Sequence, residues 1–331
     1  MTKEFVLTYL VAVIGVFVLT VVAERILIPI LRSHKAGQKI LDIGPRWHKS
    51  KEGTPVMGGM GFILASMIIM AGYFIWQAAK GRGAEHIPLS LTLAYAVANG
   101  GIGFVDDYCK LIKKQNEGLT RGQKLVLQLA VAAAYVAVMS YTGNMSTEMH
   151  IPFTNSSLSM GWAFYPVAVI LLAGVVNGGN ITDGIDGLCS SVTAVIGAFF
   201  TLLAFVWGDA DLSMSGAVLL GATLGFLVYN FHPARIFMGD TGSLFLGAMV
   251  IATAFQIREG AVGLLVAAVY IVEMLSSFLQ IFYFKVTHGK RLFRMAPLHH
   301  HLEKYGWGEN QIVAVFSAAE LLFCTLAWFA L

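Results

Sequence analysis

The chain has 331 residues, of which 57% are hydrophobic and only 12% charged, and its formal net charge at neutral pH is +3. Soluble globular chains carry about 25% charged residues, so this composition excludes a soluble protein and indicates a polytopic membrane protein. The basic residues flank apolar runs without an interleaved aromatic pattern and do not indicate nucleic-acid binding. Cys109, Cys189 and Cys324 are too few and too scattered for a disulfide framework.

Ten apolar runs are long enough, or nearly long enough, to cross a bilayer. They cover residues 5–31, 56–77, 88–105, 125–141, 162–176, 188–207, 215–230, 241–257, 261–285 and 310–331. Runs three, five, seven and eight are short, which predicts helices that stop at polar motifs lining a wet cavity. We therefore expect an all-α polytopic integral membrane protein with about ten transmembrane helices, forming a single domain over residues 1–331.

The loop charges predict the orientation of these helices. Of the 22 Lys and Arg residues, seventeen flank one set of loops and four flank the other. The positive-inside rule assigns the basic set to the cytoplasm. Ten crossings then place both termini outside the cytoplasm, and all the polar motifs described below fall on the cytoplasmic face. We therefore expect an active site at that face.

The first motif joins Asp106 and Asp107 to Lys110 at the end of the run over residues 88–105. Adjacent helical residues point about 100° apart, so the two carboxylates converge only where the helix frays. Asp106 and Lys110 are also spaced i,i+4, which is typical of a surface ion pair. A functional site and a surface pair are both open interpretations of this motif.

The second motif spans residues 177–187, where Asn177, Asn180, Asp183 and Asp186 recur every three residues. Each step of three rotates a helical position by about 60°, which predicts one polar stripe. The alternative is a turn between two spanning helices, because Asn, Asp and Gly are turn residues. Four amide and carboxylate groups in register favour a ligand site.

The third motif covers residues 237–243 at the start of the run over residues 241–257. Asp240 is a preferred helix N-cap, which is the structural interpretation. In the functional one, Asp240 holds a cation while the helix N-terminus and Ser243 face a phosphate. Phe237 at this bend is suited to stacking on a nucleobase. Asn230 closes the preceding run and is expected to face the same cavity.

Two further polar groups lie near the predicted cytoplasmic face. His299, His300 and His301 are adjacent, unlike the i,i+4 pairs of helical zinc sites, so phosphate contact or acid–base chemistry is favoured over a chance loop cluster. Within the run over residues 261–285 we expect Glu273 to make an interhelical hydrogen bond. Gln280, nearer the cytoplasmic end, is a candidate ligand contact.

Carboxylates beside bilayer-length apolar runs are costly and usually functional. The five aspartates of the three motifs therefore predict one shared site for a hard divalent cation and phosphates.

Together the motifs resemble the bacterial phospho-N-acetylmuramoyl-pentapeptide transferases, within the polyprenyl-phosphate N-acetylhexosamine-1-phosphate transferase superfamily. The resemblance runs from about residue 44 to residue 308 and includes the ten-helix pattern, although residues 32–47 and 142–161 match poorly. Sister transferases share the carboxylate motifs. The segment 295–301 and the loop 53–59, in which Val56 stands where Thr is more usual, are more specific to the muramyl-pentapeptide branch.

This resemblance implies transfer from UDP-N-acetylmuramoyl-pentapeptide to undecaprenyl phosphate, giving lipid I and UMP for peptidoglycan synthesis. It also implies Mg²⁺, a homodimer in the bacterial cytoplasmic membrane among its lipids, and binding of nucleoside inhibitors at the uridine site. By motif position, Asp240 would ligate Mg²⁺, and the catalytic residues would be Asp106, Asp107, Asp240 and His300. The implied substrate-binding residues are Lys49, Thr54, Lys110, Lys124, Asn177, Asn180, Asp183, Asp186, Asn230, Phe237, Ser243, Gln280, His299 and His301.

Three other functions are weighed against this one. A sister enzyme that transfers N-acetylglucosamine phosphate to the same lipid would share the carboxylate motifs. A secondary transporter would carry polar residues through both halves of the membrane, whereas here they gather at one end and no inverted repeat is visible. A scaffold of a cell-wall complex would leave the five aspartates unexplained.

Overall fold

The computed structural model of the chain describes residues 3–33, 51–113, 118–154, 156–257 and 260–331. Helices dominate these residues, and a short antiparallel hairpin pairs Glu148 with Ser159. In chain order the elements are α1 (Lys3–Ser33), α2 (Gly59–Ala79), η2 (Gly83–His86), α3 (Ile87–Lys113), α4 (Arg121–Tyr141), β1 (Glu148–His150), β2 (Ser157–Ser159), η3 (Gly161–Ala163), α5 (Phe164–Thr182), α6 (Leu188–Trp207), α7 (Ala210–Asn230), α8 (Gly239–Gln256), α9 (Gly260–Val266), α10 (Ala268–Val286), α11 (Leu298–Glu303) and α12 (Glu309–Ala330).

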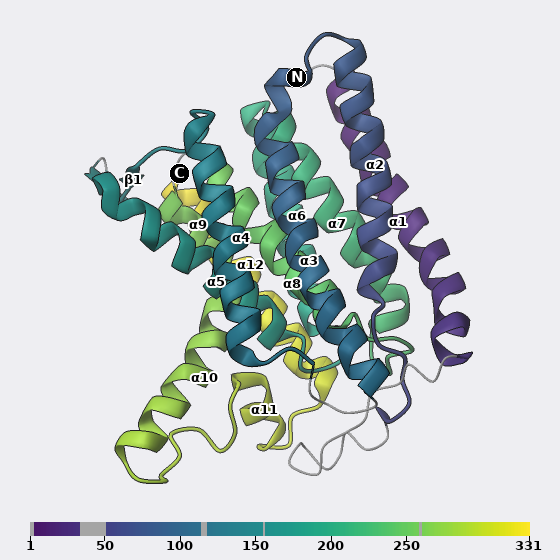
Figure 1. The fold of residues 1–331 in the computed structure, drawn as a ribbon, viewed down its shortest axis with the longest axis vertical. Coiled ribbons are helices and arrows are strands. Elements are labelled where there is room, and N and C mark those ends of the chain that lie inside the picture. The colour runs from purple at the N-terminus through teal and green to yellow at the C-terminus, as the bar shows by residue number, and fades with distance from the viewer. Residues whose placement is uncertain (1–2, 34–50, 114–117, 155, 258–259) are drawn as a thin grey trace.

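Within the described residues, nine helices are long and apolar enough to cross a membrane. The one expected span that is not among the nine covers residues 241–257 and corresponds to α8. Every residue of α8 from Thr241 to Ala254 is buried. The helix lies inside the bundle against α3, α5, α2 and α9 (Figure 1), and its glycine and hydroxyl side chains face protein rather than lipid. The all-α polytopic prediction is therefore confirmed, with one helix enclosed by the others.

Three expected helix boundaries are corrected by the structure. The third helix does not stop before Asp106 but continues to Lys113, so both aspartates lie within regular helix rather than at a frayed end. The fifth helix likewise continues to Thr182 and carries Asn177 and Asn180. The expected run over residues 261–285 is divided into α9 and α10 at Ala267. In α3 and α5, polar residues in the last turns lower the hydropathy of the sequence without ending the helix.

Close backbone packing places the first turn of α8. A Cβ built on Gly103 of α3 would lie 2.1 Å from the carbonyl oxygen of Asp240, and one on Gly59 of α2 would lie 2.3 Å from Cα of Gly242. Real side chains do not fit at such distances, so glycine at these positions allows α2 and α3 to reach the backbone of α8. The start of α8 is therefore held between two other helices.

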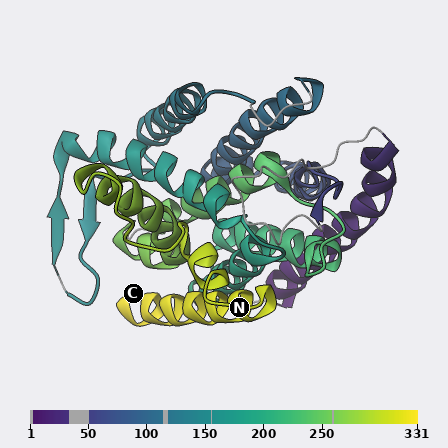
Figure 2. The same cartoon turned by 90° about the horizontal axis from the view of Figure 1, so that it is seen from below.

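The start of α1 and the end of α12 lie at the same end of the bundle, and α11 lies at the other end (Figure 1). Seen from the α11 end, the hairpin of β1 and β2 projects on the side of the bundle opposite to α1 (Figure 2). The ends of α3 and α5 and the beginning of α8 meet near the α11 end. The three polar motifs of the sequence are thus gathered at one end of the molecule.

Candidate active site

Three carboxylates meet where α3 ends and α8 begins. Asp106, Asp107 and Asp240 each offer one oxygen, and these atoms lie within 4.8 Å of one another. The side chains of Asp106 and Asp107 are 1% and 3% exposed, whereas that of Asp240 is 16% exposed. Three acidic groups this close repel one another strongly unless positive charge lies among them.

Two lysines supply that positive charge. Nζ of Lys110 lies 2.6 Å from Oδ2 of Asp106 and 3.0 Å from Oδ2 of Asp240. Nζ of Lys124, from the first turn of α4, lies 2.5 Å from the same oxygen of Asp240 and 3.3 Å from Asp106. The expected i,i+4 pair of Asp106 and Lys110 therefore exists, but it is part of the buried cluster rather than a surface contact.

Asp107 binds the N-terminus of α8. Its Oδ1 accepts a hydrogen bond from the backbone N–H of Asp240 at 3.2 Å. Its Oδ2 accepts one from the N–H of Thr241 at 2.9 Å and another from the Thr241 hydroxyl at 2.7 Å. The first N–H groups of a helix have no partner within the helix, and a carboxylate there also interacts favourably with the helix dipole. Asp107, which belongs to α3, therefore caps α8, and the side chain of Asp240 does not serve as the cap.

A side chain of α5 and a backbone N–H of the segment before α4 orient the other two carboxylates. Nδ2 of Asn180 donates to Oδ1 of Asp240 and to the hydroxyl of Ser243, both at 2.8 Å. The backbone N–H of Leu119 donates to Oδ1 of Asp106 at 2.8 Å. Oδ2 of Asp106 and Oδ2 of Asp240 are the oxygens that face the lysines. These two atoms define the centre of the cluster.

A second ionic cluster surrounds Asp186, beyond the end of α5. Nζ of Lys51 lies 2.7 Å from Asp186 and 2.7 Å from Glu309 at the start of α12. Nδ1 of His232 and the N–H of Ala234 both lie 2.9 Å from Oδ2 of Asp186. Lys51, His232 and Glu309 are not among the candidates chosen from sequence, since they lie far apart along the chain and form no local pattern.

Asp186, His232 and Glu309 form a second group whose ligand atoms are close enough to hold a metal ion. Lys51 already lies between the two acidic members. The cluster joins the loop before α2, the turn after α5, the loop after α7 and the start of α12. The ion pairs and hydrogen bonds of this cluster hold these loops together.

Asp183 caps the C-terminus of α5 between the two clusters. Burial raises the pKa of its carboxyl well above the usual range, and the carboxylates of Asp240, Asp107 and Asp186 raise it further, while Lys51 opposes the rise. The neutral form of a carboxyl group can donate a hydrogen bond, which an ionised carboxylate cannot do. The predicted polar stripe is therefore confirmed for Asn177 and Asn180, which lie on α5. Asp183 and Asp186 lie in the turn that follows the helix.

The three histidines have separate partners. His299 is fully buried, and its Nδ1 lies 2.9 Å from Oε2 of Glu273, as expected for an interhelical contact of Glu273. A Cβ built on Gly184 would lie 2.1 Å from Nε2 of His299, so α11 packs directly onto the turn that follows Asp183. Nδ1 of His300 lies 2.6 Å from Glu303, and Nδ1 of His301 accepts the N–H of Arg294 at 3.0 Å.

Three other predicted ligand contacts have local hydrogen-bond partners. Asn177 donates to Gln128 of α4 at 2.7 Å, on the face of α5 one turn before Asn180. Asn230 accepts from Ser190 and donates to the carbonyl of Ile236, so it supports the loop that leads to α8. Gln280 binds the backbone of residues 292 and 293 in the loop before α11. Their direct contact with a ligand stays a prediction.

The loop before α2 and the loop before α8 lie side by side. The N–H of Phe237 donates to the carbonyl of Pro55 at 2.8 Å, and the N–H of Gly58 donates to the carbonyl of Phe237 at 2.9 Å. This pairing fixes the half-buried Phe237 next to the Thr54 loop. Lys49, the remaining candidate, lies outside the described residues.

The carboxylate cluster of Asp106, Asp107 and Asp240 fits a divalent cation by its donor set, because hard cations prefer several carboxylate oxygens. The carboxylates attract such an ion, and the ammonium groups of Lys110 and Lys124 beside them attract a phosphate. The half-exposed position of Lys110 gives the cluster an opening to solvent at the end of the bundle. The site can therefore bind anionic, metal-chelating groups next to a membrane.

Comparison with known proteins agrees with this chemistry. Residues 89–258 match the sequence profile of glycosyl transferase family 4. Phospho-N-acetylmuramoyl-pentapeptide-transferases of Halalkalibacterium halodurans and Bacillus subtilis are 40% and 42% identical to the chain, over 94% of both sequences in each case. That of Caldicellulosiruptor bescii is 38% identical over 96% of this chain and 95% of its own length. This multi-pass membrane protein belongs to the phospho-N-acetylmuramoyl-pentapeptide-transferase family.

Proposed function

We propose that the protein transfers phospho-N-acetylmuramoyl-pentapeptide from its UDP-linked donor to undecaprenyl phosphate, releasing UMP and forming lipid I for peptidoglycan synthesis. The observation that carries this proposal is the cluster of Asp106, Asp107 and Asp240 with Lys110 and Lys124 at one end of a membrane bundle. A pyrophosphate donor and a lipid phosphate are both anionic and chelate cations. A site at the membrane face serves one soluble and one lipid substrate.

Mg²⁺ is the proposed cofactor, with Asp240 as its principal protein ligand. Asp240 is the most exposed of the three carboxylates, and Mg²⁺ commonly uses one or two carboxylates together with substrate phosphates and water. When bound, the ion would neutralise charge on the donor phosphates and on the departing UMP. Asn180 holds Oδ1 of Asp240, so Oδ2 faces the lysines and would be the oxygen that holds the ion.

The remaining charged residues take distinct proposed roles. Lys110 and Lys124 would exchange their carboxylate contacts for phosphate oxygens when the donor binds, and the bound cation would then supply the positive charge among the carboxylates. Asp107 acts by positioning, since both its oxygens are used in holding the first turn of α8. Asp106 keeps Oδ2 toward the centre and is assigned to orient, or to deprotonate, the lipid phosphate.

The chemistry favours direct attack over a covalent phospho-enzyme. A lipid phosphate oxygen would attack the β-phosphorus of the donor, and the bond from that phosphorus to the bridging oxygen of UMP would break in line. Phosphate oxyanions are already nucleophilic, so a covalent step through an aspartate would lower the barrier little. Phosphoryl transfer needs mainly positioning and charge neutralisation, which the cluster supplies.

The uridine end of the donor is assigned to the region of Phe237 and Asp183. Phe237 is fixed beside the Thr54 loop and offers a ring for base stacking. Asp183, with its raised pKa, is suited to donating a hydrogen bond to an acceptor of the base or ribose. Nucleoside inhibitors would bind in this region, with Lys49, His300 and Gln280 as the proposed outer contacts.

We propose that this end of the bundle lies in the cytoplasm and both termini lie outside it, and the asymmetry of the loop charges supports this orientation. The proposed location is the plasma membrane of a bacterium, and the proposed assembly is a homodimer. The sister reaction with UDP-N-acetylglucosamine is the competing function. Purified protein with Mg²⁺ and undecaprenyl phosphate is given each UDP-sugar in turn, and UMP release is followed. We expect release from UDP-N-acetylmuramoyl-pentapeptide only. Release from UDP-N-acetylglucosamine at a comparable rate would contradict the proposal.

A further inference from the structure

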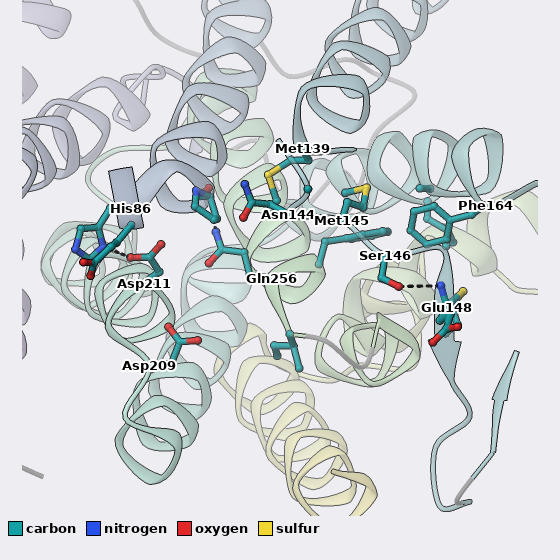
Figure 3. A pocket seen from close by; sticks show the side chains of 18 of the residues that line it. His86, Met139, Asn144, Met145, Ser146, Glu148, Phe164, Asp209, Asp211 and Gln256 are labelled. Carbon is teal, nitrogen blue, oxygen red and sulfur yellow. Dashed lines mark hydrogen bonds and ion pairs between the residues drawn. The ribbon is translucent and has the colours of Figure 1, made fainter. Parts of the chain in front are cut away.

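A cavity of about 740 Å³ (Figure 3) lies at the end of the bundle that carries β1, opposite α11 and the carboxylate cluster (Figure 1). It is lined by η2 and the start of α3, the segment after α4, and the starts of α5 and α7. The last turn of α8 also lines it. Its volume is in the range of about 300–1,000 Å³ that is typical of small-molecule sites. Neither the transfer reaction nor its residues require a cavity at this end.

The rim of the cavity is acidic. Its lining includes Glu85, Glu148, Asp209 and Asp211, against one permanent cation, Arg82. Nε of Arg82 lies 3.0 Å from Glu85, so this charge is matched by one of the four carboxylates. Asp211 pairs with Nδ1 of His86, whereas Glu148 and Asp209 are exposed to solvent and leave the opening negatively charged. A cation is the complementary ligand charge.

The inner wall is apolar. It is lined by Met145, Met149, Phe164 and Leu171 of α5, and Phe255 of α8. Methionine side chains adapt to irregular apolar ligands. An acidic rim above an apolar wall is complementary to an amphipathic molecule with a positive head.

Two polar atoms of lining residues are buried without a hydrogen-bond partner among the described residues. One is Nε2 of His86, a residue that is 3% exposed and whose Nδ1 pairs with Asp211. The other is Oε1 of Gln256, whose Nε2 donates to Thr92. In Figure 3 the Gln256 amide projects toward the side of the cavity that carries His86 and Asp211. A buried carbonyl oxygen without a donor is costly, and a ligand N–H would satisfy it.

We propose that this cavity binds a cationic amphiphile, namely a protonated organic amine with an apolar body. The ammonium group lies beside Asp209 and Asp211 and donates to Oε1 of Gln256, while Glu148 lies across the cavity and adds to the negative charge of its rim (Figure 3). The apolar body lies along the wall of Met145 and Phe164. This site is independent of the phosphate site, which recognises anions at the other end of the molecule.

Three probes with the same body and different heads test the charge preference: 4-phenylbutylamine, 4-phenylbutanol and 4-phenylbutyrate. Binding to the purified full-length protein is measured by calorimetry in a neutral maltoside detergent at low salt. We expect the amine to bind at least about fivefold more tightly than the alcohol, and the carboxylate more weakly than either. Equal affinity of amine and alcohol would overturn the proposal.

Two variants locate the binding. The double variant Glu148→Gln with Asp209→Asn removes two rim charges, and Asn at position 209 keeps the N-cap of α7. We expect it to weaken amine binding about five- to tenfold while alcohol binding is unchanged. Met145→Trp should weaken both by filling the cavity. Glu52→Gln, at an exposed carboxylate outside the cavity, is the matched control. Wild-type affinity for the amine in either cavity variant would overturn the assignment.

Discussion

The cap that Asp107 provides for α8 gives a sharp prediction for Asp107→Asn. In the wild type, three donors from Asp240 and Thr241 converge on the two oxygens of this nearly buried side chain. Asparagine keeps the shape but retains only one acceptor oxygen, and its NH₂ group then faces backbone N–H groups. At least one donor at the start of α8 loses its partner.

The magnitude follows from the contacts. A hydrogen bond to a charged group contributes about 1.5–3 kcal/mol, and a buried donor left unpaired costs about 1–3 kcal/mol. These two figures describe overlapping effects, so we expect a loss of about 2–3 kcal/mol in the free energy of unfolding. For a chain of 331 residues that corresponds to a decrease in Tm of about 3–4 °C. Because the cap also positions Asp240, UMP release should fall about a hundredfold.

The assay is thermal unfolding of purified protein in neutral detergent, followed by tryptophan fluorescence, alongside UMP release. Asp209→Asn is the matched control, because Asp209 caps α7 through a single hydrogen bond to the N–H of Leu212 and asparagine caps equally well. We expect its Tm to match that of the wild type. If Asp107→Asn also keeps the wild-type Tm while losing activity, Asp107 acts directly on substrate or metal and the positioning role is refuted.

Three further predictions concern the base, the orientation and the reaction path. Phe237→Ala should weaken binding of uridine ligands by about 1–3 kcal/mol in calorimetry, whereas the neighbouring Phe231→Ala should not; unchanged binding would limit Phe237 to packing. In a Cys109→Ser background, a membrane-impermeant maleimide added to intact cells should label a cysteine at Ala84 but not one at Gly122, and the reverse pattern would contradict a cytoplasmic site. Rapid quench with donor labelled in the β-phosphate and no lipid acceptor should give no labelled protein. Labelling at the turnover rate, together with UMP release, would instead support a phospho-enzyme.

Hydropathy predicted most of the helices because apolar runs of bilayer length leave the backbone few alternatives to helix. It failed where a helix carries polar residues in its last turns, as α3 does at Asp106 and α5 does at Asn180. It also counted α8 with the membrane spans, although that helix is enclosed by protein. The break at Ala267 has no signal in hydropathy, since apolar residues continue on both sides.

The grouping of Asp106, Asp107 and Asp240 was predictable because each lies beside a long apolar run at the same face. The role of Asp107 was not, since its partners are backbone N–H groups that lie more than a hundred residues away. Asp240 was correctly placed at a helix start, but the side chain that caps that helix belongs to α3. The cluster of Lys51, His232 and Glu309 around Asp186 depends on loop packing that no spacing rule encodes.

We propose that the metal ion lies at the cluster of Asp240 and serves the transfer reaction there. Binding of Mn²⁺, as a paramagnetic substitute for Mg²⁺, is measured by electron paramagnetic resonance for the wild type, Asp240→Asn and Glu309→Gln. Glu309 is the matched control, because it belongs to the second group able to hold a metal. We predict that Asp240→Asn loses the bound ion and UMP release, whereas Glu309→Gln retains the bound ion. Retention of the ion by Asp240→Asn and its loss from Glu309→Gln would contradict the account.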